Sequence, residues 1–208
     1  SRYQKEHSSS ISLVDNRDTH QVYALNIGVE LAKGKYIIRC DAHSVYPATY
    51  FSGIIEFYLN DKAGIYGNVG FRYITQVTIS SKWQHGIALA MSSRFGVGLS
   101  HRQVRALERP RSVDTLLFGA WRREIFEKIG AFDTSFIRGQ DYEHNLRIRR
   151  AGLAIALIPG APFKYFTRSS FKNMRRMIYQ YAYVKGQLVR KFRSAPNFRS
   201  LVPVIFHF

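Results

Sequence analysis

The stretch that decides the fold is QVYALNIGVELAKGKYIIRCDAHSVYP, residues 21–47. Apolar residues recur at helical spacing through residues 21–34, and Gly34 is a natural end for that helix. The run KYIIRC, residues 35–40, follows at once and predicts a strand. Pro47 keeps the chain beyond it from continuing as a central strand. The stretch therefore predicts a helix and then a strand, with polar residues at the carboxyl end of the strand.

The segments on either side continue this alternation. Residues 11–16, ISLVDN, alternate in polarity and predict a short strand, and residues 49–60 predict a second amphipathic helix. A strand–helix–strand–helix order is typical of an α/β layer with a parallel sheet. Residues 64–118 are rich in glycine, with short strand-like pieces and an Ala- and Met-rich helix at 82–93.

The last third predicts further helices and a buried strand. Residues 121–130 and 140–152 predict helices that end at glycine, and residues 153–159 predict the strand. Residues 169–192 predict a long helix with one apolar stripe and basic residues mainly off that stripe. The stripe consists of Phe171, Met174, Ile178, Tyr181, Leu188 and Phe192, and the basic residues are Lys172, Arg175, Arg176, Arg190 and Lys191.

The composition indicates a folded and strongly basic chain. Hydrophobic residues make up 46% of the 208 residues, enough to form a core. The single cysteine, Cys40, excludes an internal disulfide and fits a reducing compartment. The formal net charge is +17; no acidic residue follows Glu143, whereas 13 lysines and arginines lie between Arg147 and Arg199. Such a surface binds nucleic acid, an anionic membrane or phosphorylated substrates, and the charge alone does not choose among them.

Three polar side chains stand where ligand chemistry is expected. Asp41 and His43 follow the strand 35–40, and ligands of parallel α/β sheets bind at the carboxyl ends of strands. Both can reach one divalent cation that holds a pyrophosphate; a turn-initiating Asp beside an uninvolved His is an equally simple interpretation. Asp141 opens the helix 140–152, where the helix dipole favours a carboxylate in any case.

Several long segments together resemble family-2 glycosyltransferases. ALNIGVELAKGKYIIRCDAHSVYP (24–47) is similar to the stretch that leads into the metal motif of that family, and FGAWRREIFEKIGAFDTSFIRGQDYEHNLRIRRAG (118–152) to the stretch that contains its catalytic acid. YFTRSSFKNMRRMIYQYAYVKGQLVRK (165–191) resembles the helix that follows in the exopolysaccharide, succinoglycan-type branch. SSRFGVG (92–98) and VDTLLFGA (113–120) also fit that branch. The segments cover nearly the whole chain, in the order of the family.

The resemblance implies a GT-A type fold, a Rossmann-like α/β fold that binds a nucleotide sugar. It assigns residues 1–168 to the catalytic domain, and residues 169–208 to a basic interfacial helix and the start of a membrane segment. The family begins with a strand–helix–strand unit that holds the base and ribose of the donor, and we expect the chain to lack this unit. The end LVPVIFHF, residues 201–208, is interpreted as the first turns of a membrane helix, with a short core strand as the alternative.

The resemblance also assigns the site residues. Asp41 and His43 fall where the family carries its metal motif, and Asp141 falls where it has its general base. The positions expected to bind donor or acceptor are Asn26, Arg39, Gln140, Glu143, Asn145, Gln180, Tyr181 and Lys185.

The implied reaction is a single-displacement, inverting transfer from a nucleoside-diphosphate sugar, with a UDP-sugar as the expected donor and Mn²⁺ or Mg²⁺ as the cofactor. The implied acceptor is a polysaccharide or a lipid-linked saccharide at the cytoplasmic face of the bacterial inner membrane. The basic helix would lie on the anionic membrane surface, or else dock on the sheet with a solvated basic face; no nucleic acid partner is expected.

Two other classes of protein remain open from the residues alone. A nucleic-acid-binding protein would explain the charge, but it leaves the polar end of the strand 35–40 and Asp141 unexplained. A non-catalytic membrane-surface module built around the basic helix is the third hypothesis.

Overall fold

The computed structural model describes residues 6–7, 10–76, 82, 85–86, 106–166 and 171–193, without the side chains of residues 171, 173, 174 and 177. The expected helix at 82–93 falls largely outside these residues. The segment 92–98 and the apolar end 201–208 lie wholly outside them.

The described strands of the larger sheet follow the order β1–β6–β3–β7–β5. Their bounds are β1 Tyr36–Ile38, β3 Tyr66–Gly70, β5 Arg111–Ser112, β6 Ala120–Arg122 and β7 Ala154–Leu157. β3 and β7 are parallel, whereas β6 is antiparallel to both β1 and β3, and β5 is antiparallel to β7. The sheet is therefore mixed: the expected parallel pairing is present between β3 and β7, and β6 and β5 add antiparallel pairs.

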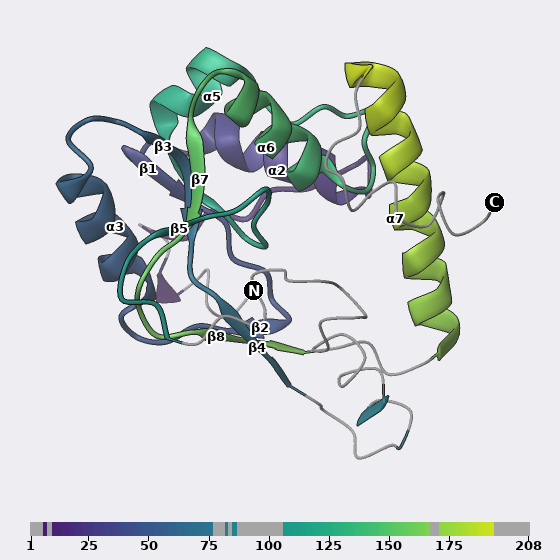
Figure 1. The fold of residues 1–208 in the computed structure, drawn as a ribbon, viewed down its shortest axis with the longest axis horizontal. Helices are drawn as coiled ribbons and strands as arrows, with labels where there is room; N and C mark the ends of the chain where they lie inside the picture. Colours follow the sequence, from purple (N-terminus) through teal and green to yellow (C-terminus); the bar gives the residue numbers. More distant parts are fainter. Residues whose placement is uncertain are drawn as a thin grey trace.

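A smaller sheet lies below the larger one in Figure 1. It consists of β2 Ser44–Val45, β8 Phe163–Phe166 and β4 Tyr73–Gln76, in the order β2–β8–β4. β2 is antiparallel to β8, and β4 is parallel to it. The chain passes from the larger to the smaller sheet after β1, β3 and β7. The first of these connections, residues 39–43, contains Asp41 and His43, so both lie where the two sheets meet.

Helices cover both faces of the larger sheet (Figure 1). α2 (Gln21–Leu31), α5 (Arg123–Ile129) and α6 (Gln140–Arg150) pack on one face, and α3 (Tyr50–Asn60) packs on the other. Neighbouring residues of β6 point to opposite faces, so Ala120 joins the core under α3 and Trp121 joins the core under α2 and α5. The elements expected at 21–34, 35–40, 49–60, 140–152 and 153–159 are confirmed in type.

Two expected elements differ from the structure. Residues 11–16 form no strand, because they have no partner strand in the described part of the chain and Leu13 is 67% exposed. The helix expected at 121–130 begins only at Arg123, and the residues before it form β6. β6 lies between β1 and β3, and its insertion makes this part of the sheet antiparallel.

α6 is buried mainly through polar residues. Gln140, Glu143, His144 and Asn145 are each less than 5% exposed. The helix starts after Gly139, whose φ of 70° is left-handed, and a Cβ there would lie 2.4 Å from a methyl carbon of Val184 in α7. Glycine at this position therefore lets the start of α6 contact α7 closely.

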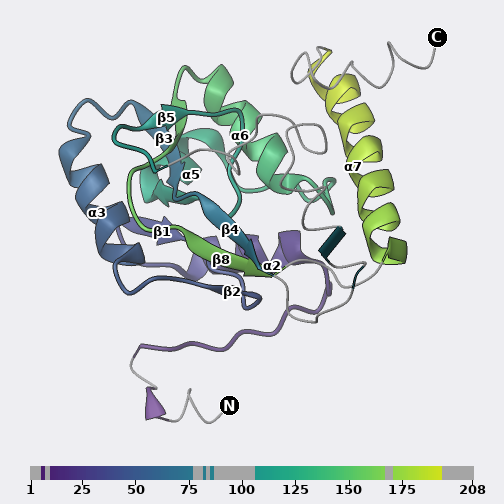
Figure 2. The same cartoon turned by 60° about the horizontal axis from the view of Figure 1, so that its bottom comes forward.

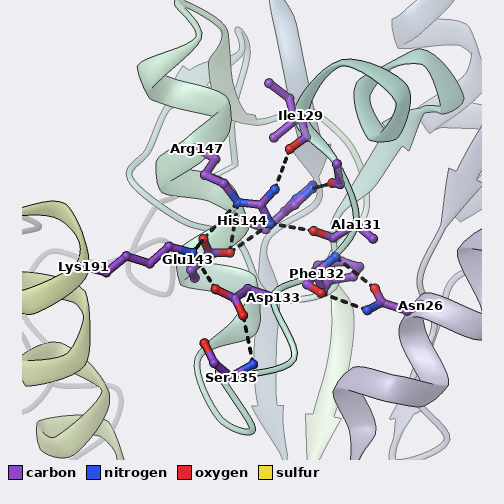
Figure 3. A network of polar contacts seen from close by, with 11 residues as sticks. Asn26, Ile129, Ala131, Phe132, Asp133, Ser135, Glu143, His144, Arg147 and Lys191 are labelled. Carbon is purple, nitrogen blue, oxygen red and sulfur yellow. Dashed lines mark hydrogen bonds and ion pairs between the residues drawn. The ribbon is translucent and has the colours of Figure 1, made fainter.

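α7 (Phe171–Phe192) lies beside α6 in both Figure 1 and Figure 2. Its buried Val184 and Leu188 pack against Phe136. Lys191 donates to Asp133 over 2.5 Å and to the fully buried Glu143 over 2.6 Å (Figure 3). The second half of α7 is thus attached to α6 and the loop before it by apolar packing and by ion pairs.

These contacts correct the expected apolar stripe of the helix at 169–192. Leu188 is buried, but Ile178 and Tyr181 are 54% and 52% exposed, and Lys191 is not a free surface cation. The buried side is centred on Val184 and Leu188 instead, because α6 and the loop before it supply the apolar and acidic partners there. None of the helices in the described part of the chain combines the length and the apolar character needed to cross a membrane.

The attachment of α7 gives a stability prediction. Lys191→Met should lower the free energy of unfolding by about 1–2 kcal/mol, because the buried Glu143 loses a cationic partner; solvent around the partly exposed lysine limits the loss. Denaturant unfolding of this variant and of Arg190→Met, an exposed neighbour, measures the difference. Equal unfolding free energies for the two variants would contradict the role given to Lys191.

Candidate functional site

A cavity of about 350 Å³ opens between the connection 39–43, the start of α6, and α7. Its polar lining comes from Gln21, Arg39, Asp41, His43, Thr115, Arg138, Gln140 and Asp141. Its aromatic lining comes from Tyr73, Phe118, Tyr142, Tyr165 and Tyr181. The residues assigned to the metal and to the base therefore line the same cavity, although they lie about 100 positions apart in the sequence.

Arg39 joins the two aspartates directly. Its Nε donates to Asp41 Oδ1 over 2.8 Å and its Nη2 donates to Asp41 Oδ2 over 3.0 Å. Its Nη1 donates to Asp141 Oδ1 over 2.6 Å. A guanidinium can hold two carboxylates in this way because its N–H groups point in fixed directions. We refer to Arg39, Asp41 and Asp141 as the carboxylate bridge.

The bridge is largely out of contact with water. Arg39 is 8% exposed, and its guanidinium lies 5.3 Å from the centre of the Phe118 ring. Burial alone would lower the pKa of Arg39, but the negative charges of Asp141 and Asp41 outweigh it and raise that pKa above its ordinary value. The bridge therefore consists of one firmly charged cation and two carboxyl groups.

Arg39 donates to both oxygens of Asp41, but to Oδ1 of Asp141. Burial raises the pKa of its carboxyl above the ordinary value, and the charge and hydrogen bond of Arg39 oppose that rise. Its side chain remains 24% exposed on the cavity side. A carboxylate with a raised pKa that is open to a ligand is a better proton acceptor than an ordinary aspartate.

Phe118 forms part of the wall in a strained backbone conformation. Its φ of 54° is left-handed, which is uncommon for a bulky residue and marks local strain. The next residue is Gly119, where a Cβ would lie 2.2 Å from Asn68 Oδ1. Gly119 in turn accepts a hydrogen bond at its carbonyl from the backbone N–H of Arg39. This close approach fixes the Phe118 ring against the bridge.

Asp41 and His43 can supply two ligands to a divalent cation whose other ligands are phosphate oxygens and water. Among the described residues the Asp41 carboxylate accepts bonds from Arg39 and Gln21, which leaves one of its roughly four acceptor positions open at Oδ1. The exposed His43 ring packs edge-on against Tyr165 and lines the same cavity. No three His, Cys, Asp or Glu side chains of the described residues gather into a complete cage. One carboxylate and one imidazole suit Mn²⁺ when phosphate oxygens and water complete its coordination.

Five of the expected binding residues do not line the cavity. Asn26 exchanges two hydrogen bonds with the backbone of Phe132, and Asn145 bonds to Asn68 and Thr115. Glu143 is fully buried between Arg147 and Lys191 (Figure 3). Gln180 and Lys185 lie on α7 outside the lining. The structure gives the first three a scaffold role; Arg39, Gln140 and Tyr181 do line the cavity.

Several residues that line the cavity are not among the site residues expected from the sequence. Gln21 begins the helix before the expected metal motif, Thr115 lies in the segment 113–120, and Tyr73 and Tyr165 belong to the smaller sheet. Arg138 and Tyr142 stand within three residues of Asp141, and this nearness is a signal that the sequence offers. Tyr73 and Tyr165 reach the cavity through the pairing of β4 with β8, which residue patterns do not reveal.

The fold belongs to the GT-A class of nucleotide-sugar transferases. The chain superposes on the crystal structure of GalNAc-T7 with UDP, GalNAc and Mn²⁺ with a TM-score of 0.57 at 16% identity, covering 81% of this chain and 34% of that one. The likeness confirms the expected α/β fold.

The family follows from the sequence comparison. The family model described as "Glycosyl transferase family 2" matches residues 1–130, more than half of the chain. The chain belongs to this family, as the resemblance predicts.

Two curated relatives cover most of the chain. One is the dolichyl N-acetyl-alpha-D-glucosaminyl phosphate 3-beta-D-2,3-diacetamido-2,3-dideoxy-beta-D-glucuronosyltransferase of Methanococcus voltae, 28% identical over 90% of this chain. The other is the succinoglycan biosynthesis protein ExoA of Rhizobium meliloti (strain 1021), 27% identical over 93% of this chain. The chain spans 58% and 57% of the lengths of these relatives.

His144 anchors α6 to α5 and to the loop after α5. Its ring stacks on Phe126, packs against Phe132, and bonds through Nε2 to the Gly130 carbonyl over 3.1 Å (Figure 3 shows its surroundings). Burial, together with the nearby positive charge of Arg147, lowers the pKa of His144 to about 3. The imidazole is therefore neutral in the folded protein at neutral pH and donates its Nε2–H.

His144 should make stability depend on pH. The unfolded chain binds a proton at His144 below about pH 6.5 while the folded chain does not, so the free energy of unfolding falls as pH decreases from 6.5 toward 3. Between pH 7.5 and 5.5 the loss should be about 1.4 kcal/mol. Denaturant unfolding at both pH values should show a smaller loss for His144→Gln, and an unchanged loss for His20→Gln at an exposed site. An equal pH dependence in wild type and His144→Gln would contradict this assignment.

Proposed function

We propose that the protein transfers a sugar from a nucleoside-diphosphate sugar to a hydroxyl group of a saccharide acceptor. The observation that carries the proposal is the carboxylate bridge, which holds a candidate metal ligand and a candidate base in one aromatic-lined cavity of a family-2 chain. Aromatic rings bind the apolar faces of sugars, and carboxylates hold metal ions and accept protons.

Asp141 acts as the general base of a single displacement. The acceptor oxygen forms a bond to the anomeric carbon of the donor, and the bond from that carbon to the diphosphate breaks. The electron pair leaves with the diphosphate, and the hydroxyl proton passes to Asp141. The configuration at the anomeric carbon is inverted, and no covalent intermediate on the protein is required. The cavity exposure of Asp141 and its raised pKa suit this role.

Asp41 and His43 hold the divalent cation, for which we propose Mn²⁺ or Mg²⁺ with a UDP-sugar as donor. When bound, the cation supplies positive charge against the charge that develops on the leaving diphosphate. Arg39 orients Asp41 for this contact, and the Phe118 wall limits access of water to it. The relative GalNAc-T7, crystallised with UDP and Mn²⁺, supports this choice of donor and cation.

The acceptor we propose is a polysaccharide or a lipid-linked saccharide. The names of the two relatives refer to a dolichyl-linked sugar phosphate and to succinoglycan biosynthesis, and both are consistent with such an acceptor. Tyr181 of α7 and Tyr142 of α6 line the same cavity as Asp141, and their rings could pack against a saccharide ring of the acceptor. An oligonucleotide ligand would leave the carboxylate bridge without a role.

α7 supports a membrane location for this reaction. Away from its docked side it exposes Tyr179 and Tyr183, 73% and 62% accessible, and basic residues recur with them at spacings of three, four or seven. These residues are Lys172, Arg175, Arg176 and Arg190. Tyrosines and cations in one row suit an anionic bilayer surface. We propose the cytoplasmic face of the bacterial inner membrane.

Removing the base should stop transfer without removing the donor. Asp141→Asn keeps the size of the side chain but cannot accept the proton, so the turnover number should fall about 100-fold or more while donor affinity stays within a few-fold. Transfer from a panel of UDP-sugars and calorimetric binding of UDP measure the two effects. Wild-type turnover in this variant would remove Asp141 from the mechanism, and lost UDP binding would make it a binding residue.

Removing the metal ligand Asp41 should weaken binding of the donor nucleotide. UDP should bind more tightly with Mn²⁺ than with EDTA, and Asp41→Ala should lose that difference, because the carboxylate nearest the cation is gone. Calorimetry with and without Mn²⁺ measures it, with Asp114→Ala at an exposed site as the control. Equal UDP affinity of wild type with Mn²⁺ and with EDTA would rule out this metal site.

The basic row of α7 should govern binding to anionic vesicles. Replacing Arg175, Arg176 and Arg190 with Gln should weaken that binding strongly at low salt and less at high salt, since each cation contributes about 1 kcal/mol that salt screens. Lys191 is left intact because it is paired with Asp133 and Glu143. Sedimentation with phosphatidylserine-containing vesicles measures the effect.

A matched control keeps the same change in charge outside α7, at the exposed residues Lys33, Arg109 and Arg111. This control variant should bind the vesicles more tightly than the α7 variant. If wild type shows no preference for anionic over neutral vesicles, the membrane role of α7 is wrong.

A further inference from the structure

A second polar link runs between the two ends of the carboxylate bridge. The side-chain amide of Gln140 donates from Nε2 to Gln21 Oε1 over 3.1 Å, and Gln21 Nε2 donates to Asp41 Oδ2 over 3.3 Å. Gln140 is the residue next to Asp141, so the chain closes a ring through Asp41, Arg39 and Asp141. The ring joins the starts of α2 and α6 to the end of β1, three elements that lie together in Figure 1.

We propose that Gln21 is a positioning residue for the reaction, which relays the placement of α6 to the metal-binding carboxylate of Asp41. The inference rests on the proposed function, because it gives Asp41 and Asp141 their catalytic roles. The side chain of Gln21 is hydrogen-bonded to Asp41 and Gln140, and in this proposal it acts through Asp41.

The direction of the hydrogen bonds in the relay is fixed by charge. The ionised Asp41 only accepts hydrogen bonds, so Gln21 must turn its NH₂ group toward Asp41. Its carbonyl oxygen then faces Gln140, which must present its own NH₂ group. An amide is the side chain that can donate at one end and accept at the other, and Gln21 uses both abilities.

The two partners of Gln21 are largely buried, whereas Gln21 itself is exposed. Gln140 is 4% exposed and the Asp41 side chain is 11% exposed, so the relay ends on two side chains with little access to water. Arg39 and Gln21 together restrain both oxygens of Asp41, and the restraint on Oδ2 comes from both. Without Gln21 the carboxylate keeps only Arg39 and can rotate about its last torsion, which misplaces it for the cation.

The test measures Mn²⁺ affinity at saturating UDP in the variants Gln21→Met, Gln140→Met and the double variant. Methionine matches glutamine closely in length but cannot take part in these hydrogen bonds. Gln21→Met should raise the dissociation constant of Mn²⁺ about 3- to 10-fold, the size expected for losing one ordinary hydrogen bond at a solvent-accessible side chain. Gln140→Met does not touch Asp41, yet it should raise the constant in the same direction, because it releases Gln21.

The double variant distinguishes a relay from two independent effects. Its dissociation constant should equal that of Gln21→Met, because Gln140 acts only through Gln21. Gln187→Met on α7 is the matched control and should leave Mn²⁺ affinity unchanged. If Gln21→Met does not fold, the result for Gln140→Met alone decides, since an unchanged Mn²⁺ affinity there overturns the relay.

The outcomes also separate this inference from the proposed function. No Mn²⁺-dependent UDP binding in wild type would defeat the proposed function. Wild-type affinity in Gln21→Met, or effects of the two single variants that multiply in the double variant, would overturn the relay and leave the proposed function standing.

Discussion

The pairing of Arg39 with Asp41 and Asp141 constrains everything around it. Two carboxylates facing one cavity repel each other and are costly to bury, whereas a guanidinium between them balances the charge and holds each at a set distance. A buried ion left without its partner would cost several kcal/mol, so the end of β1 and the start of α6 must meet at this spacing.

The helix that carries Asp141 is held by directional contacts more than by apolar packing. Glu143, His144 and Asn145 each form hydrogen bonds or ion pairs to a different part of the fold, namely α7, the end of α5, and the β3 region. Apolar packing tolerates small shifts of a helix, but several hydrogen bonds at fixed angles do not. A polar interior therefore sets the direction of α6, and with it the position of Asp141.

The sequence predicts the parts of this arrangement that are local. The helix at 21–34, the strand at 35–40 and the acid at the start of 140–152 follow from residue spacing, and the family resemblance adds the roles expected of Asp41 and Asp141, but not their link through Arg39. β6 escapes prediction because three residues are too few to show a period, and its neighbours continue into a helix. The burial of Glu143 and Asn145 escapes because polar residues on a helix predict solvent exposure, and only long-range partners reverse that. The role of Gln21 escapes for the same reason, since its partners lie 20 and 119 positions away.

α7 has one side next to the cavity and another side that carries the exposed cations. Val184, Leu188 and Lys191 attach one side of α7 to α6 and the loop before it, and Tyr181 lines the cavity. A helix attached at several points transmits its orientation to the domain, whereas a helix on a flexible linker would not. If the exposed cations lie on a bilayer, the attachment therefore fixes the tilt of the domain and the height of the cavity above the lipid headgroups. A membrane-bound acceptor would then reach Asp141 past Tyr181, so the same helix would select both the surface and the path of the acceptor.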